Sequence, residues 1–165
     1  MQSFLSEDRY SPDYNWLKVS KSQYLKQYEK NPVNWLEWTE ETFDKAKREG
    51  KLVMISIGCR SCHWCEVMKS ESFEDAEIAK LLNDWFISIK VDREERPDIY
   101  SKYLNIRQEV TGNAGLPLTM FLSSDQRLLF AGNYLPKESR DGGQTFKEII
   151  IEVYTNYFLK FNQGD

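Results

Sequence analysis

The chain has 165 residues, enough for one domain whose core needs neither a disulfide nor a metal to hold it together. It carries 22 lysine and arginine residues against 26 aspartate and glutamate residues, for a formal net charge of −4, which argues against a general nucleic-acid-binding protein. The single histidine and all three cysteines lie between Cys59 and Cys65, so a zinc site with two or three histidines is excluded.

The first ten residues contain no apolar stretch typical of a secretory signal, and no run approaches the roughly 18 apolar residues of a membrane helix. The sequence therefore predicts a cytoplasmic protein that does not bind membranes. Cysteines in that compartment are usually reduced, so a cluster of them is more often catalytic or metal-binding than structural.

Residues 1–30 are polar, without a clear period, and are predicted to form an N-terminal extension with a short helix near 22–28; residues 31–165 form the predicted domain. Within this domain we expect a helix over 39–50 capped by Thr39 and Gly50, and then a buried strand over 52–57. The cysteine cluster follows, with a helical stretch to about 83, a second buried strand over 85–91 and a charged loop over 92–96. The rest of the domain is predicted to form a helix from Pro97, a hairpin over 118–122 and 128–131, and an amphipathic helix from Phe146. This order predicts an α/β fold with a mixed sheet and helices on both faces.

The chemistry concentrates in Cys62-His63-Trp64-Cys65. Cysteines at positions i and i+3 of a first helical turn have Cα atoms roughly 5–6 Å apart, within reach of a disulfide. A helix N-terminus favours the thiolate of Cys62, and a protonated His63 beside it would favour it further. Trp64 is expected either to contact a substrate or simply to cover the motif.

A metal site is the main alternative for these residues. It could use only Cys59, Cys62, Cys65 and His63, and adjacent residues at the start of a continuing helix reach one tetrahedral ion with difficulty. A buried strand leading into the motif and a helix leaving it favour a redox pair, with no metal and no cofactor. Cys59 is then either a third thiol that serves the pair or a spectator at the strand end.

Further along the chain, Pro117 opens a strand after a glycine-containing loop, which makes the preceding peptide bond a candidate for the cis form. A trans proline that merely starts the strand is the alternative.

Several separated motifs together point to a known family: Asn31-Pro32-Val33-Asn34-Trp35, Cys62-His63-Trp64-Cys65, Glu71-Ser72-Phe73-Glu74-Asp75, the run from Lys90 to Asp98, and Gly115-Leu116-Pro117-Leu118. They resemble the thioredoxin-like N-terminal domain of the YyaL and spermatogenesis-associated protein family, which is related to DsbH-type oxidoreductases and has tryptophan in place of Leu116. The resemblance covers about residues 20 to 136.

The resemblance implies a thioredoxin fold, with Cys62 as the attacking thiol, Cys65 as the resolving thiol, and Leu116 and the cis-proline Pro117 in the substrate groove. It also implies that full-length relatives continue into a large α/α-toroid domain, so this chain is expected to be one domain of a longer protein.

Two positions depart from the pattern. Glu66 stands where relatives often have a basic residue or histidine. Ser56 stands where ordinary thioredoxins have a buried acid that deprotonates the resolving thiol, which leaves Glu66 as the only nearby acceptor that the sequence suggests.

These observations together predict a thiol–disulfide oxidoreductase domain. Its substrate would be a disulfide-containing protein or a small thiol compound, and its electron donor is not named by the sequence. The alternatives are a non-catalytic thioredoxin-like adaptor and a metal-binding module using Cys59, Cys62 and Cys65.

Overall fold

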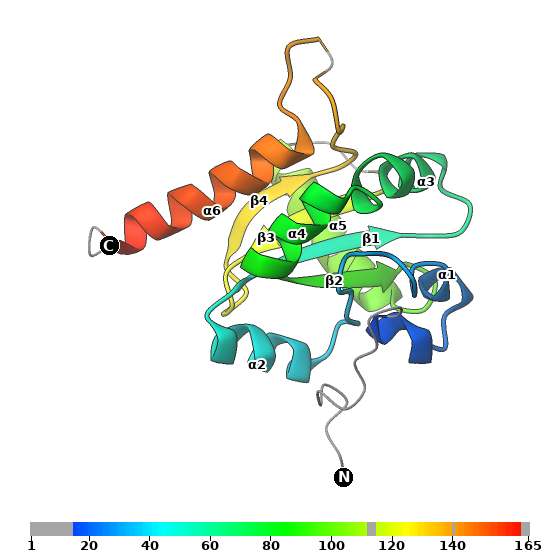
Figure 1. Ribbon diagram of the computed structural model, residues 1–165. Helices are drawn as coiled ribbons and strands as arrows, with labels where there is room; N and C mark the ends of the chain where they lie inside the picture. Colours follow the sequence, from blue (N-terminus) through cyan, green and yellow to red (C-terminus); the bar gives the residue numbers. More distant parts are fainter. Residues whose placement is uncertain (1–14, 112–114, 140, 163–165) are drawn as a thin grey trace.

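Two apolar runs rich in β-branched residues form neighbouring buried strands, as the sequence predicts. In the computed structural model, which describes residues 15–111, 115–139 and 141–162, β1 (Leu52–Gly58) and β2 (Phe86–Asp92) pair in parallel and are buried along their whole length. A strand buried on both faces needs cover on both sides, which helices supply here (Figure 1).

The remaining strands complete a four-stranded mixed sheet in the order β2-β1-β3-β4. β3 (Leu118–Leu122) pairs antiparallel with β1, and β4 (Leu128–Gly132) pairs antiparallel with β3 as the second arm of the predicted hairpin. The mixed sheet and its helical layers confirm the predicted α/β class.

Helices lie on both faces of this sheet (Figure 1). They are α1 (Gln23–Lys26), α2 (Glu40–Glu49), α3 (His63–Met68), α4 (Ala76–Trp85), α5 (Pro97–Thr111) and α6 (Phe146–Asn162), with a 3-10 turn, η2 (Trp16–Val19), before α1 and a π-helical turn, η3 (Lys69–Phe73), after α3. α4 and α6 pack on the face that carries Met54 and Phe121, whereas α2 and α5 cover the face that carries Val53, Ile55 and Ile89. Within the described ranges, no helix is long and apolar enough to cross a membrane.

The helical stretch predicted after the cysteines is interrupted, and the prediction that the second strand begins at Trp85 is wrong, because β2 begins at Phe86. Asp75 caps α4 by accepting a hydrogen bond from the backbone N–H of Ile78 at 2.9 Å, which starts a new helix. Trp85 ends that helix and stacks on Tyr154 of α6 at 4.2 Å between ring centroids. The aromatic side chain of Trp85 therefore makes a contact between two helices.

The described part of the predicted N-terminal extension, residues 15–30, packs into the core rather than forming an irregular arm. The side chains of Tyr24 and Tyr28 are fully buried under β1 and β2. The amide of Asn15 donates to the backbone carbonyls of Tyr28 at 2.7 Å and Val33 at 3.2 Å, which ties this segment to the chain that follows it. The chain that follows this segment runs along the outer edge of β2, where Leu36 forms a parallel bridge with Ile89.

Thr39 caps the N-terminus of α2, as the sequence predicts, and a substitution there tests the contribution of the cap to stability. Thr39 Oγ1 accepts a hydrogen bond from the backbone N–H of Thr42 at 3.1 Å. Replacing Thr39 with alanine removes this acceptor, so we expect the free energy of unfolding to fall by about 1 kcal/mol. Urea unfolding followed by tryptophan fluorescence measures the change. Thr39→Ser keeps the acceptor and should lose much less; equal losses in the two variants would contradict the capping role.

Candidate functional site

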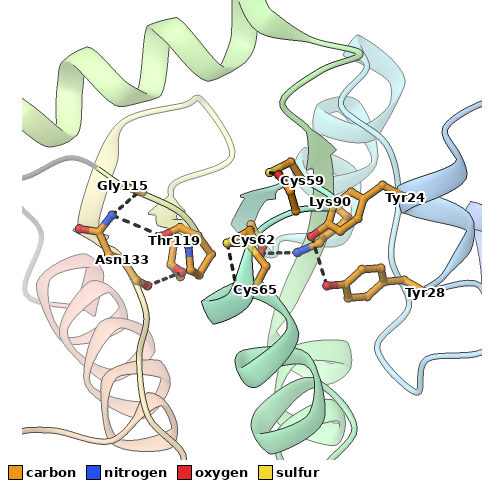
Figure 2. The surroundings of a disulfide bond; sticks show 12 residues. Tyr24, Tyr28, Cys59, Cys62, Cys65, Lys90, Gly115, Thr119 and Asn133 are labelled. Atoms are coloured by element: carbon orange, nitrogen blue, oxygen red, sulfur yellow. Dashed lines mark hydrogen bonds between the residues drawn. A yellow bond between two sulfur atoms is a disulfide. The ribbon is translucent and has the colours of Figure 1, made fainter.

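Cys62 and Cys65 lie where β1 leads into α3, and they are joined by a disulfide (Figure 2). Their Cα atoms are 5.2 Å apart, in the range predicted from the spacing. Cys62 is the N-cap of α3, and its Sγ accepts a hydrogen bond from the backbone N–H of Cys65 at 3.2 Å. Cys62 is partly exposed and Cys65 is buried, so only one sulfur of the pair faces solvent.

The two residues between the cysteines are both exposed at the surface. Trp64 packs on Tyr134 with ring centroids 4.8 Å apart, and the His63 ring lies edge-on to Trp64 at 5.3 Å. Tyr134 is held in turn by a hydrogen bond from its hydroxyl to the carboxylate of Glu71. The side chains of Trp64 and Tyr134 thus form an aromatic surface next to the partly exposed sulfur.

The loop before β3 is fixed by Asn133, a residue that the sequence did not single out. The Leu116–Pro117 peptide bond is cis. The Asn133 amide donates to the carbonyl of Gly115 at 3.0 Å and to that of Pro117 at 3.3 Å, and its oxygen accepts from Arg107 Nε at 2.8 Å (Figure 2). One asparagine therefore holds both sides of the Leu116–Pro117 bond in place.

Cys59 takes no part in the disulfide. Its side chain is 2 % exposed, and its Sγ lies 3.6 Å from the hydroxyl oxygen of Ser61. Within the described ranges, no group of three or more histidine, cysteine, aspartate or glutamate side chains is arranged to hold a metal ion.

Behind the disulfide lies Lys90, the largest departure from what the sequence suggested. Its side chain is 1 % exposed, and its Nζ donates a hydrogen bond to Ser56 Oγ at 2.8 Å. Ser56 is the residue of β1 that pairs with Lys90 in the parallel register. Burial lowers the pKa of Lys90 to about 7; the negative charge of Glu66 opposes this shift, and the positive charge of Lys69 adds to it.

Two tyrosines complete this buried polar group. The hydroxyls of Tyr24 and Tyr28 lie 3.2 Å apart. Burial is the main cause that raises the pKa of each phenol above its ordinary value, so both remain neutral under physiological conditions. Figure 2 shows these tyrosines and Lys90 together near the disulfide. Glu66, the acceptor that the sequence suggested, is exposed on α3.

Comparison with known proteins agrees with this arrangement. Residues 14–163 match the family model Thioredox_DsbH, described as a protein of unknown function, DUF255. The chain is 41 % identical over 143 residues to the uncharacterized protein B0495.5 of Caenorhabditis elegans, covering 87 % of this chain and 20 % of that protein. It is 39 % identical over 139 residues to the human spermatogenesis-associated protein 20, covering 84 % of this chain and 18 % of that protein. The chain therefore spans about a fifth of the length of these relatives.

Solved structures give the same fold at low sequence identity. A DsbH oxidoreductase superposes with a TM-score of 0.57 at 15 % identity, over 74 % of this chain and 85 % of that one. A thioredoxin from Thermus thermophilus superposes with a TM-score of 0.52 at 19 % identity, over 81 % of this chain and 94 % of that one. These structural similarities confirm the thioredoxin fold, and the match to the family model over residues 14–163 confirms the family resemblance seen in the sequence. The chain belongs to the Thioredox_DsbH family of thioredoxin-like domains.

Proposed function

We propose that this domain is a thiol–disulfide oxidoreductase in which Cys62 attacks and Cys65 resolves. The observation that carries the proposal is the asymmetry of the pair: Cys62 is partly exposed and accepts a backbone hydrogen bond, whereas Cys65 is buried directly behind it. A thiolate that accepts an N–H bond at the start of a helix is stabilised, and the thiolate is the attacking species.

The reaction conserves atoms and electrons in two exchange steps. The Cys62 thiolate attacks one sulfur of a substrate disulfide, and the other substrate sulfur leaves as a thiolate that takes up a proton. Cys65 then loses its proton and attacks Cys62 Sγ, which releases the first substrate sulfur and closes the Cys62–Cys65 bond. Two electrons have passed from the dithiol to the substrate, and an external dithiol or two external thiols must return them and end as a disulfide.

The surface around Cys62 favours a peptide substrate. Trp64 offers an exposed ring face, 43 % exposed, on one side of the sulfur. Leu116 and Pro117 supply the adjoining loop, which Asn133 holds in place. We assign His63 a supporting role at Cys62, because a protonated imidazole next to the sulfur would favour its thiolate. The substrate class that fits is a disulfide-containing protein, and the electron donor is a small thiol or another dithiol protein.

Reduction of insulin by dithiothreitol tests the proposal. The reduced chains of insulin precipitate, so we expect the domain to shorten the lag before turbidity appears and to steepen the rise. The control is the same protein reduced and alkylated with iodoacetamide, which keeps the fold and blocks the thiols. Equal turbidity curves for the untreated and alkylated proteins would leave a non-catalytic adaptor as the better description.

The resolving step has its own test. Cys65→Ser should still attack a disulfide through Cys62 but cannot release it. We expect this variant to accumulate a mixed disulfide with insulin chains, seen as a band on non-reducing gels that dithiothreitol removes. Cys62→Ser, treated in the same way, should accumulate none. A mixed disulfide in the Cys62→Ser variant would assign the attack to another thiol.

A further inference from the structure

Lys90 is a buried amine. Among the described residues, its Nζ donates a hydrogen bond to Ser56 Oγ at 2.8 Å, and no carboxylate forms an ion pair with it. Lysine is almost never fully buried unless it is paired, because removing an ammonium group from water is costly. A lysine kept in this position calls for a physical explanation.

Aromatic rings take the place of the missing carboxylate. The Lys90 Nζ lies 4.6 Å from the ring centroid of Tyr28, 5.4 Å from that of Phe73, and 5.5 Å from those of Trp35 and Tyr24. Ring faces stabilise a cation, and burial stabilises the neutral amine. The cage therefore accommodates both protonation states of Lys90, as a group that takes up and releases a proton must.

The same cage borders the resolving cysteine. A Cβ added at Gly58 would lie 2.8 Å from Cys65 Sγ and in still closer contact with the Tyr24 hydroxyl oxygen. Because Gly58 has no side chain, the Tyr24 hydroxyl and the Cys65 sulfur can both lie against its backbone. The Tyr24 hydroxyl is in turn within hydrogen-bonding distance of the Tyr28 hydroxyl, whose ring lies against Lys90. The Tyr24 hydroxyl therefore lies close to the Cys65 sulfur, and the Tyr24 ring borders Lys90, with its centroid 5.5 Å from Nζ.

Other charged groups surround the cage from separate elements. Glu66 on α3 and Lys69 on η3 act on Lys90 with opposite signs. Lys69 Nζ lies 5.5 Å from the Tyr28 ring centroid and forms an ion pair with Glu74 at 3.5 Å. Both Glu66 and Lys69 reach solvent, whereas Lys90 does not, so Lys90 is the titratable amine enclosed with Cys65.

We propose that Lys90 is the proton acceptor for the resolving thiol Cys65, with the Tyr24 hydroxyl between them. The inference rests on the proposed oxidoreductase function and assigns the role that the sequence left open at Ser56. In the second exchange step the Cys65 S–H bond breaks, its proton passes through the Tyr24 hydroxyl to the neutral Lys90 amine, and the Cys65 sulfur bonds to Cys62 Sγ as the substrate sulfur leaves with its electron pair. Lys90 later returns the proton to solvent.

Ellman's reagent separates the two exchange steps in time. All proteins carry Cys59→Ser, so that each contains only two thiols. The reduced protein releases a first thionitrobenzoate when Cys62 attacks the reagent, and a second when Cys65 closes the disulfide. We expect Lys90→Met to leave the first phase within about threefold and to slow the second roughly 100-fold at pH 7, the usual contribution of a positioned base. The difference should shrink at high pH, where hydroxide can take the proton in place of the amine.

Two further variants separate a proton acceptor from a structural role. Tyr24→Phe keeps the ring and removes the hydroxyl, and should also slow the second phase alone. Lys69→Met removes the same charge from outside the cage and should change either phase by less than about threefold. A second phase in Lys90→Met with the rate and pH profile of the parent overturns the inference. A parent that releases no second thionitrobenzoate overturns the oxidoreductase proposal itself, and the role of Lys90 with it.

Discussion

Replacing Cys62 with serine is expected to reduce insulin reduction to the rate of dithiothreitol alone. Cys62 is the sulfur of the pair that reaches solvent, and Cys65 is buried behind it. A serine hydroxyl does not ionise near neutral pH and does not form a disulfide, so neither the attack nor the closure takes place. The turbidity assay described above measures the loss, with circular dichroism on the reduced proteins to show that the fold is retained.

Cys59→Ser is the matched control, because it removes a thiol three positions away on the same loop. Cys59 is buried and lies outside the disulfide, so this variant should keep insulin reduction within about threefold of the parent. Two results would contradict the assignment. Cys62→Ser could retain the parent rate, or Cys59→Ser could lose as much as Cys62→Ser, which would make Cys59 part of the reaction.

The fold was predictable from the sequence because its signals are local. The runs at 52–58 and 86–92 contain β-branched residues on both faces, which only a fully covered strand explains. Thr39 and Gly50 mark the ends of α2 through a side-chain cap and a positive φ of 65°. The spacing of Cys62 and Cys65 fixes their separation as soon as a helix follows, so that part of the site was also predictable.

The groups behind the disulfide were not predictable in the same way. The aromatic cage combines Tyr24 and Tyr28, Trp35, and Phe73, from segments far apart in the sequence, and no local pattern announces that they meet. One signal was present: Lys90 interrupts a strand that is otherwise read as buried on both faces. A lysine in such a strand means either that the prediction of a strand buried on both faces is wrong or that the lysine has a special environment. The structure shows that Lys90 has a special environment, the aromatic cage.

The network at Asn133 escaped prediction for a similar reason. Its partners Arg107, Gly115 and Pro117 come from α5 and from the loop before β3, and the hydrogen bonds form only when β4 lies beside β3. An asparagine after a strand is ordinarily read as a turn residue. Its role at the candidate site depends on tertiary contacts, which a single sequence does not contain.

The stability of the domain should rise with pH between about 7 and 10, with Lys90 as the cause. Its pKa is about 7 in the folded protein and near the ordinary 10.5 in the unfolded chain. Between these values the unfolded chain binds a proton that the folded protein does not, so raising the pH favours folding. Below pH 7 both states are protonated, and the unfavourable burial of the charge is fully present, on the order of 5 kcal/mol.

Lys90→Met removes this dependence and isolates it. Methionine fills the cage without a charge, so the variant should be more stable than the parent at pH 6, and the two free energies of unfolding should converge as the pH approaches 10. Above pH 10 both proteins should lose stability, because burial raises the pKa of Tyr24 and Tyr28, and the unfolded chain releases their protons first. Urea unfolding of the disulfide form at several pH values measures the difference, with Lys69→Met as the control for lost charge. Curves for the parent and Lys90→Met that stay parallel from pH 6 to 10 would show that the amine keeps its proton over this range in the folded domain, and would remove the basis for its role as a proton acceptor near neutral pH.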